Sequence, residues 1–224
     1  MSYGALFIGN SGQVQIDDNY PCYMEVAAGS YDGSSGTVTV SYPVAINSPN
    51  PPAVFVRPDG AHILRYMRNL GGPGNWTGWT ALLYADGGFS GIVRSGQYKA
   101  AALYLPRTGG YGLQVFDASN RLLFDSNRQV LRIISGAQTW SKVGYNGSYQ
   151  GNWTTDTWGS PYVAGSYVLA SHFMAMFSFP PNVAEMGVGF VNGNAKTQMN
   201  AFAMRLGLGL PAINNFNWPL VMVN

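Results

Sequence analysis

Two short segments combine tryptophan with small neutral polar residues, and they are the clearest candidates for a binding site. GGPGNWTGWT contains Trp76 and Trp79, and QGNWTTDTWGS contains Trp153 and Trp158. An indole ring can cover the C–H face of a sugar while nearby amides and hydroxyls bond its polar edge, and exposed rings also anchor protein interfaces. The candidate binding residues are Trp76, Trp79, Trp153, Trp158, Tyr149 and Asn152. The alternative is that the rings fill the core or a subunit interface, because tryptophan is highly buried on average.

Hydrolytic chemistry finds little support in the acidic residues. There are ten of them, and only Glu25 and Glu185 are glutamates. A glycosidase needs two carboxylates that face each other across a cleft. Asp32, Asp86 and Asp156 instead lie in stretches rich in Gly, Ser or Thr, where aspartate is favoured because it forms turns. We therefore predict no catalytic residue and keep a glycan-degrading enzyme as the less favoured alternative.

Residues that commonly bind metals are sparse. His62 and His172 could meet around the axis of an oligomer, but no nearby residue completes a ligand set, so a hydrogen-bonded histidine at a strand end is the favoured interpretation. Cys22 is the only cysteine, which excludes an intrachain disulfide, and we interpret it as a small, partly buried residue. The sequence contains no Gly-rich phosphate loop and no metalloprotease or hydrolase signature. We predict neither a metal nor a cofactor.

The composition narrows the class of protein. Of the 224 residues, 46% are hydrophobic and only 10% are charged, whereas charged residues make up about a quarter of a typical soluble domain. The few basic residues are scattered singly, which argues against nucleic-acid binding. No apolar run reaches the roughly 18 residues that span a bilayer, and the first residues lack the pattern of a secretory signal. We therefore expect a protein made in a reducing cytoplasm, without a membrane span.

Short strands separated by turns are the elements that must position these residues. Thr37–Tyr42 alternates valine with polar residues, which is the period of a half-buried strand. Apolar or aromatic runs predict further strands at 54–57, 63–67, 79–84, 101–105 and 167–178. Ala85–Gly88 predicts a hairpin turn. The best helix candidate, Gln198–Leu206, is short and is left open. This pattern predicts an all-β fold of the antiparallel sandwich type.

An internal repeat indicates a duplicated unit. Residues 3–26 (YGALFIGNSGQVQIDDNYPCYMEV) match residues 111–134 (YGLQVFDASNRLLFDSNRQVLRII) at a constant offset of 108, so that Tyr3 corresponds to Tyr111 and Asp17 to Asp125. In each copy, turn residues separate two apolar stretches, which predicts a hairpin. We place a boundary near residues 107–110 and predict two related antiparallel β-sandwich-like units, 1–108 and 109–224, that pack closely.

The repeated string also carries a resemblance to a known family. GYGLQVFDASNRLLFDSNRQVLRI, together with MSYG…GNSGQVQIDDNY, resembles tail-tip and tail-fibre proteins of tailed, siphophage-like bacteriophages. These proteins show a hairpin motif of YG, a turn and an apolar-DS stretch at the chain start and again in mid-chain. The second copy matches the motif at Tyr111, Gly112, Phe124, Asp125 and Ser126. The first copy departs from it, because Asp17 is followed by Asp18 rather than by serine.

This resemblance implies a virion component of the distal phage tail, assembled in the cytoplasm of the bacterial host. It implies other phage tail proteins and further copies of the chain as partners, with a trimer as the expected oligomer, and a host-surface glycan or receptor as a candidate contact. The low charge agrees with a surface that partners cover. The alternative is a purely structural adaptor or collar that makes no receptor contact. Exposure of Trp79 and Trp158 would separate the two interpretations.

Overall fold

The computed structural model describes the main chain of residues 6–8, 14–17, 20–60, 62–84, 93–149, 153–171, 176–179, 182–190, 198–206 and 215–224. Side chains are described over 20–60, 62, 64–83, 93–141, 160, 162–171 and 220–224. Every regular element within these ranges is a β-strand, which confirms the expected all-β fold.

The strands fall into three groups along the chain. Two small hairpins are formed by β1 (Leu6–Ile8) with β2 (Val14–Asp17), and by β9 (Gln114–Phe116) with β10 (Leu122–Asp125). The N-terminal half of the main body contains β3 (Met24–Asp32), β4 (Thr37–Ile46), β5 (Ala53–Pro58), β6 (His62–Gly72), β7 (Asn75–Tyr84) and β8 (Ser95–Ala102). The C-terminal half contains β11 (Ile133–Tyr149), β12 (Trp153–Pro161), β13 (Tyr167–Leu169), β14 (Met176–Phe179), β15 (Asn182–Phe190), β16 (Gln198–Leu206) and β17 (Asn215–Val223).

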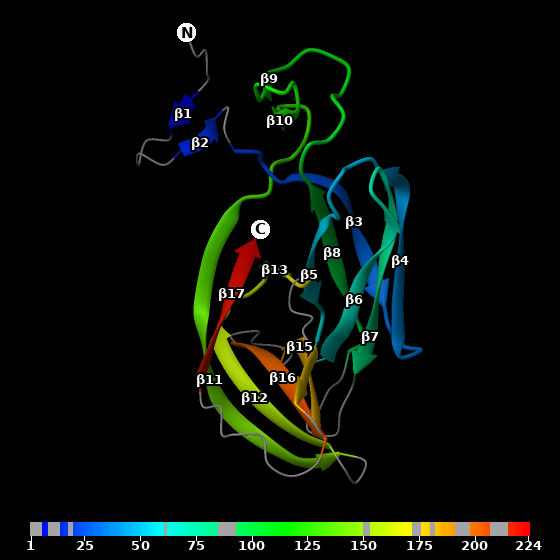
Figure 1. Ribbon diagram of the computed structural model, residues 1–224, viewed down its shortest axis with the longest axis vertical. Coiled ribbons are helices and arrows are strands. Elements are labelled where there is room, and N and C mark those ends of the chain that lie inside the picture. The colour runs from blue at the N-terminus through cyan, green and yellow to red at the C-terminus, as the bar shows by residue number, and fades with distance from the viewer. Residues whose placement is uncertain are drawn as a thin grey trace.

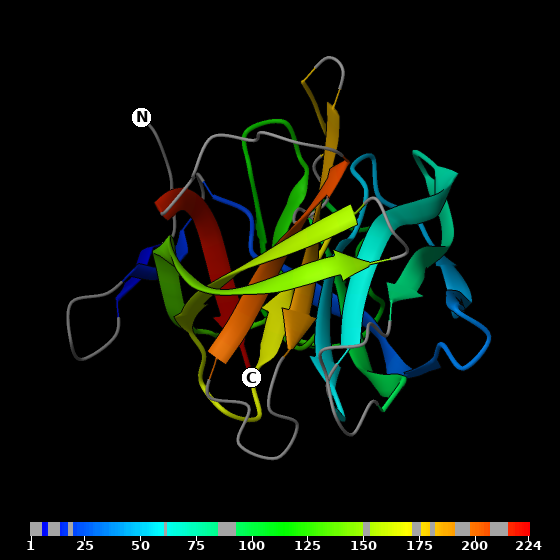
Figure 2. The same ribbon diagram turned by 90° about the horizontal axis from the view of Figure 1, so that it is seen from below.

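One long, curved antiparallel sheet forms the main body. Its strand order is β3-β8-β5-β13-β17-β11-β12-β16-β15-β6-β7-β4, and β14 adds to β15. Figure 1 shows β3 to β8 on one side and the long strands β11, β12 and β17 curving along the other, with both small hairpins beyond the same end of the body. Figure 2, seen from below, shows β17 (red) on one side and β6 and β7 (cyan to teal) on the other, with β11 and β12 (yellow-green) crossing between them.

Within the N-terminal half, β3, β8 and β5 pack face to face against β6, β7 and β4 in a sandwich-like arrangement. Trp79 of β7 makes edge-on ring contacts with Tyr31 of β3, at a centroid distance of 5.7 Å, and with Tyr98 of β8, at 5.8 Å. Rings at these separations stabilise beyond the area that they bury. Gly96 is required on the opposing strand, because a Cβ there would lie 2.4 Å from the Tyr31 hydroxyl oxygen.

The burial of individual strands follows from their sequences. β4 alternates exposed threonine and serine with buried Val38, Val40 and Tyr42, as its period of two predicts. β5 reads as a continuous apolar run and is buried on both faces: Val54 and Val56 belong to the sandwich core, whereas Phe55 packs on the other side against Leu131 and Val223. A strand in the middle of the structure needs such a two-sided apolar pattern.

Gln198–Leu206, left open as a helix candidate, is strand β16. It pairs with β12 over all nine of its residues and with β15 over seven. The ladders on both sides decide the conformation, because propensity is a weak preference that tertiary pairing overrides. Two other expectations need different bounds or lie outside the described residues. The strand expected at 101–105 is the end of β8, which stops at Ala102, and the turn expected at Ala85–Gly88 lies outside the described residues.

The two repeat copies form hairpins with the same bounds and register. The offset of 108 carries β1 onto β9 and β2 onto β10. It also carries the pair Leu6↔Asp17 onto Gln114↔Asp125, and the irregularity in the ladder falls at the same place in both. The repeat in the sequence is therefore a repeat of backbone structure. The division into two related units at 1–108 and 109–224 stays a prediction.

The segments that follow the two hairpins pair with each other. Leu131 N donates to Tyr23 O at 2.9 Å, and Met24 and Val130 form an antiparallel bridge. Leu131 is the residue that the repeat offset assigns to Tyr23, so the contact joins equivalent positions. An antiparallel register centred on equivalent positions is the one that a local two-fold relation between the copies requires.

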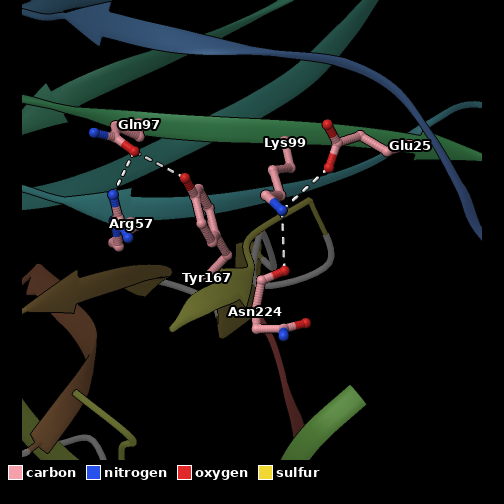
Figure 3. Close-up of polar contacts among 6 residues, drawn as sticks. All are labelled: Glu25, Arg57, Gln97, Lys99, Tyr167 and Asn224. Carbon is pink, nitrogen blue, oxygen red and sulfur yellow. Dashed lines mark hydrogen bonds and ion pairs between the residues drawn. The ribbon is translucent and has the colours of Figure 1, made fainter. Parts of the chain in front are cut away.

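Strands from the two halves of the chain also pair with each other in the same sheet. β13 pairs with β5, and β15 pairs with β6. On the outer face beside β13, the Tyr167 ring lies 4.8 Å from Arg57 Cζ and 5.0 Å from Lys99 Nζ, measured to the ring centroid. The Tyr167 hydroxyl donates to Gln97 Oε1 at 2.8 Å, as Figure 3 shows.

Lys99 fixes the other side of this cluster. Its Nζ lies 3.1 Å from Glu25 Oε2 and donates to the main-chain oxygen of Asn224 at 3.0 Å (Figure 3). Side chains of β3, β5 and β8 thus hold β13 and the last described residue of the chain against the N-terminal half.

The Tyr167 cluster should stabilise the whole body. Tyr167→Ala removes two cation–π contacts and a hydrogen bond and is expected to lower the free energy of unfolding by about 1–3 kcal/mol. Tyr167→Phe keeps the ring and should cost roughly 0.5–1.5 kcal/mol, the net value of one hydrogen bond. Urea denaturation followed by circular dichroism measures both, with the exposed Val44 of β4 replaced by Ala as control. Equal losses for the two Tyr167 variants would contradict a role for the cations.

Candidate functional site

Trp79, one of the candidate binding residues, is a core residue. Its side chain is 0% exposed and lies between the two sheets of the sandwich. Along β7 the residues Trp79, Ala81 and Leu83 are buried, which is the inward face of a strand with period two. The ring therefore fills the core, which is the alternative that the sequence left open for it.

Trp76 has a positioning role. It is half-buried against the core, and its Nε1 donates to Ser48 O at 3.0 Å. Gly74 N donates to the same oxygen at 2.8 Å, so the β6–β7 turn holds the segment after β4 in place. Ser48 is itself fully buried, and its hydroxyl donates to Leu103 O at 2.9 Å.

The other four candidates are placed only through the main chain. Trp153 is paired with Tyr149 across the β11–β12 ladder, and Trp158 is paired with Lys142 on β11 and Ala201 on β16. The side chains of Trp153, Trp158 and Tyr149, and all of Asn152, lie outside the described residues. The structure thus brings Trp153 and Tyr149 together on the paired strands β12 and β11. Trp76 and Trp79 lie on β7, which pairs with neither of these strands.

His62 lies in the core with partners on both ring nitrogens. Its Nδ1 is 2.7 Å from Val93 O and its Nε2 is 2.9 Å from the Tyr31 hydroxyl oxygen. A carbonyl only accepts, so Nδ1 carries the proton and Nε2 accepts from Tyr31. Burial, helped by nearby Asp59 and Tyr162, raises the pKa of Tyr31 well above its usual value, which keeps the phenol protonated as a donor. His172 lies outside the described residues.

The acidic side chains that are described bond to neighbouring groups. Asp32 Oδ1 accepts from Ser34 N at 2.8 Å in the β3–β4 turn, which is the turn role expected for it, and Glu25 pairs with Lys99. The side chains of Asp86 and Asp156 lie outside the described residues. Among the described residues, no three His, Cys, Asp or Glu side chains gather as a metal site.

Asp125, the aspartate of the second repeat copy, is a buried carboxylate that fastens the β9–β10 hairpin. Oδ2 accepts from Thr108 Oγ1 at 2.6 Å, from Thr108 N at 3.2 Å and from Gln114 Nε2 at 3.0 Å, while Oδ1 accepts from Asn127 N at 2.9 Å. Desolvation opposes ionisation, but these hydrogen bonds outweigh it and lower the pKa of Asp125 to about 2. The carboxylate therefore ties the segment that leaves β8 to both strands of the hairpin.

The hairpin groove lies where these tied segments meet, near β9 and β10 in Figure 1. We use this name for a hollow of about 450 Å³ lined by residues from 47–49, 104–107 and 116–122. Ser48 joins the first wall to the second, and Asp125 joins the second to the third. Buried Leu105 and Leu122 line it beside the half-buried ring of Phe116.

Two arginines and two aromatic rings line the hairpin groove. Arg121 Cζ lies 4.4 Å from the centroid of the Tyr104 ring, and Arg107 Cζ lies 5.4 Å from that of Phe116. Asp117 Oδ2 accepts from Arg121 Nε at 2.6 Å, which orients the guanidinium. The backbone amide of Arg121 is the main cause of a lowered pKa of Asp117, so the pair is charged over a wide pH range.

Backbone strain coincides with the surface hollows. Three non-glycine residues in the described ranges have positive φ: Tyr104 (53°) and Asn120 (60°) line the hairpin groove, and Tyr66 (51°) lines a second hollow of about 530 Å³. A bulky residue in this conformation costs on the order of 1–3 kcal/mol, and such strain clusters at functional sites. The second hollow lies over β4, β6 and β7, where a bulge places Tyr66 and Met67 opposite Ala81.

Comparison with known proteins adds no relative: no protein-family model, no curated protein and no solved structure matches the chain. Among the described elements there is no helix long and apolar enough to cross a membrane. The function of the protein is therefore inferred from the chain itself.

The sequence analysis missed the hairpin groove because its walls come from three separate segments. Tyr104, Arg107 and Arg121 show no spacing that would bring them together, and the contacts that do so run through Ser48 and Asp125. The available signal was the polar DASNR turn of the repeat, in which Asp117 accepts from Ser119 N and Arg121 N.

Trp79 should matter for stability. Trp79→Ala is expected to lower the free energy of unfolding by about 3–5 kcal/mol, because it leaves a large cavity between the sheets. Leu82, on the outward face of the same strand and 38% exposed, is the control, and its replacement by Ala should cost less than about 1 kcal/mol. Thermal unfolding measures both. A Trp79→Ala variant as stable as the wild type would contradict the core assignment.

Asp125 should make stability depend on acid pH. Because folding lowers its pKa, its stabilisation is complete above the unfolded value near 4 and is lost as the pH falls through about 2. Asp125→Asn should lower the unfolding free energy at neutral pH by roughly 1–3 kcal/mol, the value of hydrogen bonds to a buried charge. The difference from wild type should shrink towards pH 2, whereas exposed Asp32→Asn should show a smaller effect throughout. A loss that does not depend on pH would show that Asp125 acts without its charge.

Proposed function

We propose that the chain is a structural component of the distal tail of a tailed bacteriophage and that it contributes to attachment of the virion to the host surface. The observation that carries the proposal is the hairpin that forms twice, with the same bounds and register, from the motif that resembles that of tail-tip and tail-fibre proteins. The motif residues have defined tasks in the second copy. Asp125 bonds the hairpin to Thr108, and Ser126 exchanges hydrogen bonds with Leu113.

The segments around the repeat also present apolar side chains to solvent. Tyr111 is fully exposed, Tyr20 is 74% exposed, and Tyr23 and Leu113 are each more than 40% exposed. Residues 20–25 pair with residues 123–131, and Leu113 exchanges hydrogen bonds with Ser126, so residues 20–25 and 111–131, which we call the hairpin end, belong to one part of the molecule. Aromatic side chains that the fold leaves exposed are suited to anchor partners. The hairpin end therefore supports assembly with other tail proteins and with further copies of this chain, a trimer being the proposed oligomer.

Burial of Trp76 and Trp79 changes where host contact is proposed. Trp153, Trp158, Tyr149 and Asn152 remain candidates in the C-terminal half, and the hairpin groove adds a second candidate surface. The structural adaptor without host contact is the alternative, and a glycan-degrading enzyme remains the less favoured one. We propose a non-enzymatic protein of the virion that is assembled in the bacterial cytoplasm.

Location on the virion is the direct test. Antibodies raised against the purified chain are expected to label the distal end of the tail in electron micrographs of virions of the phage that encodes the chain. Antibodies absorbed with the purified chain serve as control. Virions that lack the chain by mass spectrometry would contradict the proposal. Labelled virions whose chain shows no saturable binding to host cells would favour the adaptor.

The assembly surface can be tested with the purified chain. Tyr111→Ser should shift the chain towards smaller species in light scattering, whereas Val44→Ser on β4, at a 78% exposed apolar position outside the hairpin end, should not. The same oligomer for all three proteins would exclude Tyr111 from the assembly contact.

A further inference from the structure

We propose that the hairpin groove is a binding site for a saccharide that bears a carboxylate group. This inference does not rest on the place of the chain in a virion, because binding is a property of the purified protein. If the chain does attach to a host surface, the inference names the chemical class that it would recognise there.

Unused hydrogen-bond donors of two arginines are the first support. In the described part of the structure, Arg107 contacts only the Phe116 ring, and Arg121 uses its Nε for Asp117. The whole guanidinium of Arg107 and the two terminal nitrogens of Arg121 are therefore left without an acceptor there. A guanidinium presents parallel N–H groups that match the two oxygens of a carboxylate, and orienting it beforehand reduces the entropy lost on binding.

The same groove offers surfaces for a sugar ring. Tyr104 and Phe116 provide aromatic carbon, and Leu105 and Leu122 provide an apolar lining. Asn47 and Asn120 are exposed along the groove, and each amide can both donate to and accept from sugar hydroxyls. A volume of about 450 Å³ lies within the range of sites for small organic ligands and exceeds what a single inorganic anion fills.

The arrangement is held in place before any ligand binds. Ser48 and Asp125, both 0% exposed, bond the three walls together, and Asp117 holds Arg121. The positive φ angles of Tyr104 and Asn120 lie within these tied segments. Tyr104 is a bulky residue held in a strained conformation, which is expected where side chains are positioned for a ligand, whereas Asn120 adopts a positive φ as an ordinary turn residue.

Titration of the full chain with digalacturonate, followed by calorimetry and by saturation-transfer NMR, tests the site. We expect saturable binding, with affinity at least about tenfold higher than for the neutral disaccharide digalactose, since the charge-assisted bonds are lost with the carboxylates. Arg107→Gln should weaken binding about tenfold, and Arg107→Lys should restore it only in part, because lysine lacks the planar fork. Arg132→Gln removes the same charge from an exposed residue that does not line the groove and should leave affinity unchanged.

Four outcomes would overturn the proposal, the last two of which are given together. The first is equal affinity for digalacturonate and digalactose, which would remove the role of the carboxylate. The second is binding of acetate or inorganic phosphate as tightly as of digalacturonate, which would reduce the site to a simple anion site. The third is binding that Arg107→Gln and Arg132→Gln weaken equally in folded variants, or no binding up to about 20 mM ligand. None of these outcomes bears on whether antibodies label the phage tail.

Discussion

The ionised carboxylate of Asp125 is the interaction on which the hairpin end depends. Placing a charge where water cannot reach it is unfavourable unless hydrogen bonds satisfy it, and here Thr108, Gln114 and Asn127 supply them. Because the three residues lie on the segment leaving β8, on β9 and in the turn after β10, satisfying one charge fixes the hairpin relative to the body. The lowered pKa of Asp125 is the thermodynamic sign of the same bonds.

This constraint links the repeat to the proposed function. The hairpin returns in the first copy with the same register, and the segments that follow both hairpins pair at equivalent positions, Tyr23 and Leu131. In the second copy, Tyr111 is exposed and Asp125 holds the hairpin through its hydrogen bonds. These bonds can therefore hold a groove lined by Arg107 and Arg121 next to an assembly surface that includes Tyr111.

Patterns that lie within a single segment could be predicted from the sequence. The alternation in Thr37–Tyr42 and the apolar run before Arg57 gave strands β4 and β5, and the spacing of the repeat gave both hairpins. Features that depend on which segments meet could not be predicted. Trp79 begins the strand expected at 79–84, but its place in the core depends on β3 and β8, whose rings Tyr31 and Tyr98 pack against it. Gln198–Leu206 becomes a strand because β12 and β15 flank it, and the groove exists only once Ser48 and Asp125 join distant segments.

The role of the Asp125 carboxylate in holding the hairpin to the body is best measured by hydrogen exchange at the amides that donate to it. If the Asp125 carboxylate holds the hairpin, the Thr108 and Asn127 amides are protected at neutral pH, as is the Leu131 amide that pairs with Tyr23. The three amides should then open in one step. In Asp125→Asn the protection of Thr108 and Asn127 should fall by about tenfold or more, the loss expected for hydrogen bonds to a charged acceptor. Exchange of Thr108 and Asn127 in the wild type as fast as in an unfolded chain would contradict that role, because Asp125 would then not hold the hairpin to the body.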